Sequence, residues 1–241
     1  MAYIEGRTVH DADAHVMELP DKILEYLAPS AVDAFIKTAN KPITVSQDLQ
    51  NAIALQSDPS FRAEDAAQLM LRKNHLALGA FEAKDRPKTL DLLGFTSQLV
   101  FTTAALGNFG LDEKDPTLAQ AAAQAHNRMN SDFCSVDPRL LATGYVPLSD
   151  LDAAPGIAIE AIELGCRGLV VPSACPAQHS PSHRGLDPLW ALLEEAGLPV
   201  LFHVGGEEKM SPAYANNGGE LVLDCRGGDE NITGLSFMRI P

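Results

Sequence analysis

The chain has 241 residues, of which 46% are hydrophobic, and a formal net charge of −14 at pH 7. This length suits one larger domain or two small ones, and the apolar fraction is sufficient to form a core. The negative charge argues against binding to a nucleic-acid backbone, which requires clustered Lys and Arg side chains.

The N-terminus and the cysteines indicate a cytoplasmic protein. The first residues, MAYIEGRTVH, lack the basic and apolar regions of a secretory signal. No apolar run approaches the length that spans a bilayer. The four cysteines, Cys134, Cys166, Cys175 and Cys225, are widely spaced and include no C-x-x-C pair. We therefore expect reduced thiols.

The first predicted strand is TVHDADAH, residues 8–15. Side chains alternate between the two faces of a strand, so Asp11, Asp13 and His15 are expected on the same face. Acidic groups and an imidazole crowded on one face of a buried strand need a compensating partner. A metal cation is one such partner.

Residues 16–91 have a different character from the rest of the chain. They contain stretches with helical composition, such as LPDKILEYLAP, and no stretch typical of a barrel strand. We therefore interpret residues 16–91 as a long, mainly helical insertion after the first strand.

After this segment the sequence alternates between predicted strands and helices. Apolar or β-branched runs predict strands at residues 95–104, 139–148, 167–173 and 198–206. Helices are predicted at residues 115–136, 149–166 and 186–199, two of which contain an Asp-Pro start. This alternation indicates βα units and a parallel sheet. Residues 207–241 are rich in Gly, Asn and Asp and are predicted to form a loop and the start of the next helix.

His203 stands at the end of the last apolar strand. In a parallel α/β barrel the C-terminal strand ends form the active-site face, so His203 is expected near Asp13 and His15. Imidazole and carboxylate groups ligate Zn²⁺, and also Mn²⁺ or Fe²⁺. We therefore predict Asp13, His15 and His203 as metal ligands. The alternatives are that Asp13 caps the following backbone and that His203 is an ordinary core histidine.

Three further candidates lie in the loop after the fourth predicted strand. This loop opens onto the same barrel face, so His179 and His183 are predicted to contact substrate. An ordinary exposed loop would account for the two histidines equally well. Arg184 could hold a substrate carboxylate, because a guanidinium matches a carboxylate with two hydrogen bonds. Its alternative is a surface charge.

Several segments resemble, in order and spacing, the amidohydrolase-related family, which includes aminocarboxymuconate-semialdehyde decarboxylase and γ-resorcylate decarboxylase. They are DADAHVMELP, LLGFTSQLVF, NRMNSDFCSVDPRLLATGYVPLSD, ELGCRGLVVP, DPLWALLEEAGLPVLFHVGG and GGDENITGLS. The resemblance covers nearly the whole chain.

This resemblance implies an α/β fold of the TIM (β/α)₈ barrel type that holds a divalent metal, with zinc expected and manganese as the alternative. It matches Asp13 and His15 to the strand-one ligands and His203 to the strand-five ligand. The family also has a histidine after strand six and an aspartate after strand eight, which find no counterpart here. The catalytic residues are therefore unknown, and we expect an incomplete barrel of about the first five strands.

The function implied by the resemblance belongs to the full-length parent. We expect a metal-dependent hydrolase or a non-oxidative decarboxylase that acts on a cyclic or aromatic carboxylate. The expected partners are this small molecule and, in the full-length form, further copies of the chain, with no nucleic acid and no membrane. The fragment alone is expected to be inactive. The alternative is a catalytically inactive remnant that acts as an interaction module.

Overall fold

A computed structural model describes residues 2–38, 43–103, 107–108, 111–172, 179 and 181–203. The strands are β1 (His10–Val16), β2 (Ser97–Thr102), β3 (Leu140–Ala142), β4 (Gly144–Tyr145), β5 (Leu169–Val171) and β6 (Val200–Phe202). The helices are α1 (Val32–Thr38), α2 (Gln47–Ser57), α3 (Pro59–Ala63), α4 (Arg86–Leu93), α6 (Leu111–Lys114), α7 (Pro116–Cys134), α8 (Ala154–Glu163) and α9 (Asp187–Ala196). Short 3₁₀ helices are η1 (Lys22–Glu25), η2 (Asn74–Leu76), η3 (Ala83–Asp85) and η4 (Arg184–Leu186). The predicted loop and helix start in residues 207–241 lie outside the described residues.

The described strands pair in parallel and in sequence order, as β1-β2-β3 and β4-β5-β6. The predicted strand at 139–148 is divided into β3 and β4 at Thr143. The Thr143 amide donates to Val100 in β2 over 3.0 Å, whereas the Gly144 amide donates to Gly168, before β5, over 3.0 Å. The same stretch of chain therefore joins the two sheets, and the predicted parallel α/β architecture is confirmed.

The division between β3 and β4 coincides with a helix side chain that binds the strand backbone. The Asn127 amide of α7 donates to the Tyr145 carbonyl over 3.0 Å and its oxygen accepts from the Tyr145 amide over 2.6 Å. Asn130, one turn later, donates to the carbonyls of Val100 and Thr143 at 2.9 and 2.8 Å. These contacts satisfy backbone groups that a regular ladder would otherwise pair, which buried polar groups require.

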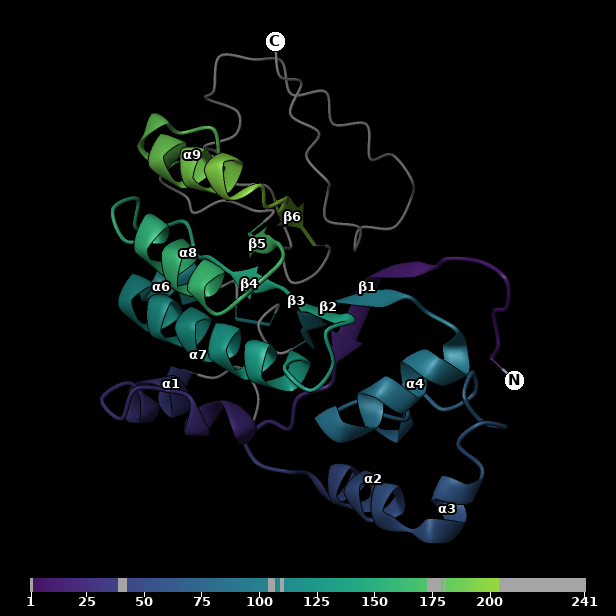
Figure 1. The fold of residues 1–241 in the computed structure, drawn as a ribbon. Coiled ribbons are helices and arrows are strands. Elements are labelled where there is room, and N and C mark those ends of the chain that lie inside the picture. Colours follow the sequence, from purple (N-terminus) through teal and green to yellow (C-terminus); the bar gives the residue numbers. More distant parts are fainter. Residues whose placement is uncertain are drawn as a thin grey trace, which may run out of the picture.

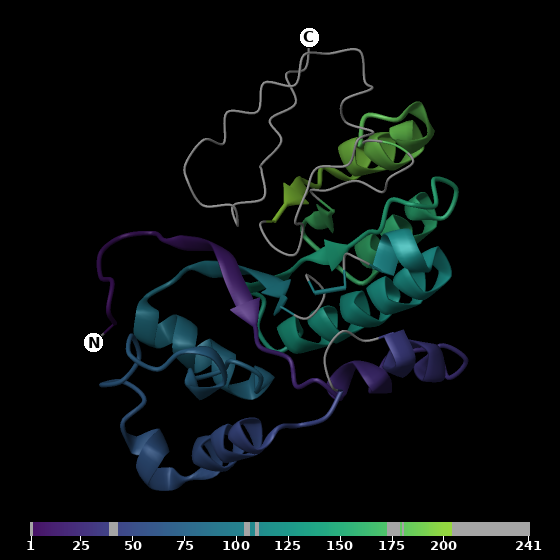
Figure 2. The same cartoon turned by 180° about the vertical axis from the view of Figure 1, so that it is seen from behind.

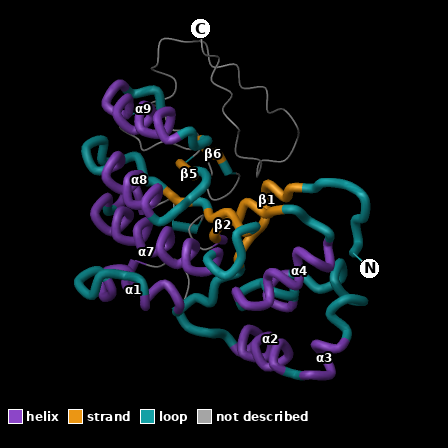
Figure 3. The backbone as a smooth tube through the Cα atoms, viewed as in Figure 1, coloured by secondary structure: helices purple, strands orange, loops and turns teal. Residues whose placement is uncertain are grey.

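Helices α7, α8 and α9 lie side by side along one side of the strands (Figures 1 and 3). The apolar core fills the space between these layers. Its fully buried side chains include Val100, Val146, Leu148, Leu169, Val171, Leu186 and Leu189. Gly144 allows close packing here, because a Cβ at this position would lie 2.8 Å from the Leu169 side chain and 2.9 Å from Ala161.

Between β1 and β2 the described residues form only helices and connecting loops. Helix α1 packs against α7 through a second apolar cluster that contains Ile23, Leu27, Phe35 and Leu118. Helices α2 and α3 lie at the periphery, far from β6 in both views (Figures 1 and 2). That residues 16–91 are an insertion, and that the barrel is incomplete, remain predictions.

The way α9 ends determines where the chain enters β6, the strand that leads to His203. Gly197 adopts a φ of +64°, which favours glycine, and the Leu198 amide donates back to Leu193 over 3.0 Å. The chain then enters β6, where Phe202 pairs with Val171 of β5. Strands β5 and β6 are shorter than the predicted 167–173 and 198–206, and residues 173 and 204–206 lie outside the described part.

Cys134 and Cys166 are free, buried thiols. Burial raises the pKa of each thiol to about 12, so neither is an activated nucleophile. Cys175 and Cys225 lie outside the described residues. In the described part of the chain, no helix combines the length and the apolar character needed to cross a membrane.

Candidate metal centre

A β-bulge in β1 determines which of its acidic residues faces the site. Asp11 pairs with Gln98 and Ala14 pairs with Val100, so Ala12 and Asp13 together stand opposite the single residue Leu99. Such a bulge re-aims the side chains beside it.

The bulge overturns one expectation from simple alternation, namely that Asp11 shares a strand face with Asp13 and His15. The Asp11 carboxylate instead accepts a hydrogen bond of 3.0 Å from the Gln98 amide. Gln98 in turn accepts a hydrogen bond of 2.9 Å from the buried Arg86 guanidinium. Asp11 therefore belongs to a polar network with Gln98 and with Arg86 of α4. The alternation of side chains between the two strand faces breaks down because the bulge adds one residue to β1.

Asp13, His15 and His203 come together at the C-terminal ends of β1 and β6. His15 Nε2 lies 3.1 Å from His203 Nε2, and His203 Nε2 lies 3.1 Å from Asp13 Oδ1. The distance from His15 Nε2 to Asp13 Oδ1 is 3.5 Å. The structure thus brings one potential ligand atom from each residue to a common point, although His203 is 188 residues from His15 in the chain.

Burial differs strongly among the three side chains. His15 and His203 are 27% and 16% exposed, whereas Asp13 is 73% exposed. Burial lowers the pKa of His15, and the neighbouring His203 lowers it further, while Asp13 acts in the opposite direction. Burial and His203 both favour the neutral form of His15, which is the form that ligates metals. The centre is closed on the histidine side and open to solvent beside Asp13.

An aromatic side chain from β2 supports both imidazoles. The Phe101 ring is stacked on His15, with centroids 5.7 Å apart, and lies 5.0 Å from the His203 ring. Phe101 pairs in register with His15, which places it on the same face of the sheet. Sequence reasoning missed Phe101, although its position in the strand adjoining β1 was a usable signal.

Thr103 and Glu18 form a second layer behind His15. The Thr103 hydroxyl lies 3.1 Å from His15 Nδ1 and donates a hydrogen bond of 2.8 Å to the Val16 carbonyl. The Thr103 amide donates a hydrogen bond of 3.1 Å to the Glu18 carboxylate. Thr103 is another residue that sequence reasoning missed, because a threonine at the end of a β-branched segment carries no signal of its own.

The three weaker candidates lie in the loop after β5. His179 is buried, and its ring centroid is 5.2 Å from that of His183. The His183 side chain caps η4 by accepting 3.0 Å from the Gly185 amide. Arg184 begins η4 and is exposed. A substrate contact from any of the three remains a prediction.

Asp112 in α6 is a buried carboxylate that sequence reasoning did not single out. It accepts hydrogen bonds from the Leu148 amide at 2.7 Å and from the Ser149 amide at 3.1 Å. Burial raises the pKa of Asp112, and these hydrogen bonds oppose that shift. Asp112 therefore fixes the loop that leaves β4 at the same end of the sheet as the metal centre.

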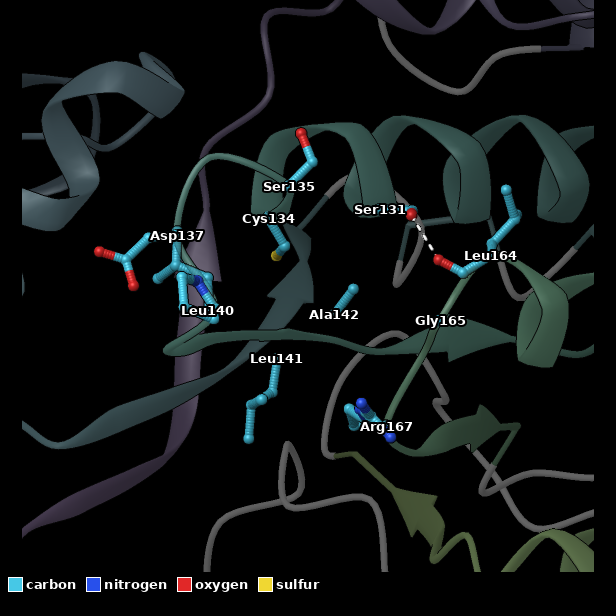
Figure 4. A pocket seen from close by; sticks show the side chains of 11 residues that line it. Ser131, Cys134, Ser135, Asp137, Leu140, Leu141, Ala142, Leu164, Gly165 and Arg167 are labelled. Carbon is cyan, nitrogen blue, oxygen red and sulfur yellow. Dashed lines mark hydrogen bonds between the residues drawn. The ribbon is translucent and has the colours of Figure 1, made fainter.

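A separate pocket of about 350 Å³ lies at the opposite end of the sheet. It is lined by the end of α7, the start of β3 and the residues before β5, including Cys134, Leu140 and Arg167 (Figure 4). Ser131 at its wall donates 2.7 Å to the Leu164 carbonyl. Active sites of parallel barrels lie at the C-terminal strand ends, so this pocket is not the candidate site.

The Asp13–His15–His203 donor set fits a divalent cation. Two imidazole nitrogens and a carboxylate oxygen are common ligands of zinc and other first-row metals. Bonds of about 2.0–2.2 Å place neighbouring ligand atoms roughly 3–3.5 Å apart. The three separations of 3.1, 3.1 and 3.5 Å match this requirement without rearrangement.

The family model described as Amidohydrolase matches residues 11–236. The chain belongs to the amidohydrolase family. This match includes every residue of the candidate metal centre and nearly the whole length of the chain. It confirms the relationship that the sequence segments indicated. No curated protein matches the chain.

Solved amidohydrolase structures have a similar fold. The amidohydrolase from Mycobacterium avium subsp. paratuberculosis is 20% identical, with a TM-score of 0.62 over 88% of this chain and 61% of its own. The 5-carboxyvanillate decarboxylase from Novosphingobium aromaticivorans, with bound manganese, is 17% identical, with a TM-score of 0.51 over 87% of this chain and 53% of its own. The present chain therefore spans about half to three fifths of the length of these proteins. The likeness supports a fold of the TIM-barrel type.

Proposed function

We propose that Asp13, His15 and His203 bind a divalent metal, with zinc as the first expectation and manganese as the alternative. In the full-length protein this metal serves a hydrolase or a non-oxidative decarboxylase that acts on a cyclic or aromatic carboxylate. The observation that carries the proposal is the convergence of three ligand atoms, with spacings of 3.1–3.5 Å, at the C-terminal strand ends.

Each residue of the centre has a distinct part in this proposal. His15 and His203 supply neutral nitrogen ligands on the closed side, where Phe101 packs against both rings. Asp13 supplies negative charge on the open side, where substrate would enter. A bound divalent cation supplies Lewis acidity, which lowers the pKa of a water ligand towards ~7 and stabilises negative charge on a substrate oxygen.

Two reaction classes are compatible with this centre. Attack by an activated water would hydrolyse an ester, lactone or amide, whereas stabilisation of the charge left as CO₂ departs would give decarboxylation. The solved 5-carboxyvanillate decarboxylase contains manganese together with a substituted 4-hydroxybenzoic acid. This supports an aromatic carboxylate as the substrate class. We propose that His179, His183 and Arg184 contact that substrate, with Arg184 facing its carboxylate.

The proposal is tested on the full-length protein after removal of metal and reloading with Zn²⁺ or Mn²⁺. We expect release of CO₂ from a hydroxybenzoic acid, or hydrolysis of a lactone or amide, that depends on the added metal. The 241-residue chain with matched metal content is assayed in parallel, to measure how much turnover the metal centre supports by itself. Full metal loading without turnover in either class would favour the alternative of an inactive interaction module.

A further inference from the structure

Thr103 makes several contacts that connect the ends of β1 and β2. Its hydroxyl oxygen lies 2.8 Å from the Val16 carbonyl oxygen and 3.1 Å from His15 Nδ1. Its backbone amide donates 3.1 Å to the Glu18 carboxylate. The hydroxyl is therefore held between the backbone of β1 and the imidazole of one proposed metal ligand.

The donor and acceptor roles at this hydroxyl are fixed by chemistry. A hydroxyl has one proton to donate, and the Val16 carbonyl can only accept. Met17 Sδ, at 3.6 Å, is a longer and weaker acceptor for the same proton. With its proton directed to Val16, the Thr103 oxygen offers only lone pairs to His15. The Nδ1 atom of His15 must then carry a proton and donate it to Thr103.

This arrangement determines what the other nitrogen of His15 can do. In a neutral imidazole one nitrogen carries the proton and the other carries a lone pair. With the proton on Nδ1, the lone pair of His15 is on Nε2, which faces His203 and Asp13. Hydrogen bonds to the non-ligating nitrogen commonly set the tautomer and ring orientation of metal-binding histidines.

We infer that Thr103 is a positioning residue that holds His15 in the Nδ1-protonated tautomer and thereby prepares Nε2 to bind the metal. The inference rests on the proposed function for its consequence, but the tautomer itself is a property of the metal-free chain. Glu18 assists by holding the Thr103 backbone, so that the hydroxyl stays between Val16 and His15.

The test compares Thr103→Val, which keeps the shape and removes the hydroxyl, with Thr103→Ser, which keeps the hydroxyl. Calorimetric titration with Zn²⁺ and with Mn²⁺ should show about 10–100-fold weaker binding for the valine variant, as for other losses of such partners. The serine variant should stay within about 3-fold of the unmodified chain, since the donor and acceptor pattern is unchanged. Thr102→Val is the matched control, because it makes the same change one residue earlier, at a buried position that pairs with Val16 and not with His15.

Nitrogen-15 NMR of the metal-free chain at mildly alkaline pH provides a second measurement. His15 should be protonated at Nδ1 in the unmodified chain and in Thr103→Ser, and should gain the Nε2-protonated form in Thr103→Val. Predominant Nε2 protonation in the unmodified chain would overturn the inference, as would unchanged metal affinity in a folded Thr103→Val variant. If the chain shows the Nδ1 tautomer but binds neither metal, the proposed function fails and the assignment of the tautomer stands.

Discussion

Replacing His15 or His203 with alanine is expected to weaken Zn²⁺ and Mn²⁺ binding by more than about 100-fold, beyond the range typical for partners in the outer shell. Each substitution removes one of three ligand atoms that lie within 3.5 Å of one another. Because His15 and His203 are the two more buried members, water cannot easily take the place of the lost nitrogen. Calorimetric titration, with metal analysis after dialysis, measures the effect.

His10→Ala is the matched control for this experiment. His10 lies on the same strand, is exposed, and contacts Ser97 over 2.7 Å, apart from the metal centre. Its replacement should leave the affinity unchanged. A chain that retains full affinity without His15, or that loses as much affinity without His10, would show that the metal lies elsewhere.

Replacing Asn127 with leucine is expected to lower the free energy of unfolding by about 2–6 kcal/mol. Leucine has a similar size but cannot pair with the Tyr145 amide and carbonyl, which Asn127 holds at 2.6 and 3.0 Å. Leaving a buried polar group unsatisfied costs ~1–3 kcal/mol, and two groups are affected here. The loss is a large part of the usual ~5–15 kcal/mol of stability. Urea unfolding followed by circular dichroism measures it.

Arg128→Leu, at the next position of α7, separates this effect from general damage to the helix. Arg128 is exposed and forms its ion pair with Glu160 near the surface. Such pairs contribute ~0–1 kcal/mol, so the change should be small. Equal destabilisation by the two variants would contradict the role given to Asn127.

The sequence was sufficient to predict the parallel α/β architecture, because buried parallel strands appear as continuous apolar runs between amphipathic helices. It could not predict the break between β3 and β4. That break coincides with the Asn127 side chain, which binds the backbone of Tyr145 from α7, the helix directly before β3 in the chain. Sequence periodicity records the pattern of a strand and not the contacts that interrupt it.

The sequence was sufficient to predict the ligands of the candidate site but not the residues that surround them. Asp13, His15 and His203 carry the chemistry of metal binding in their side chains, and the position of each at a strand end indicated a common face. Asp11 was assigned to the wrong face because the bulge at Ala12 and Asp13 depends on pairing with β2. Phe101 lies in β2 and Thr103 directly follows it, and the pairing of β2 with β1 brings Phe101 against both histidines and Thr103 against His15.

The most direct test of the metal centre is a crystal structure of the chain soaked with Zn²⁺ or Mn²⁺, with anomalous data collected on both sides of the metal absorption edge. We expect one anomalous peak at about 2.0–2.2 Å from Asp13 Oδ1, His15 Nε2 and His203 Nε2. A fully occupied peak bound by other residues, or the absence of a peak among these three atoms at saturating metal, would contradict the account.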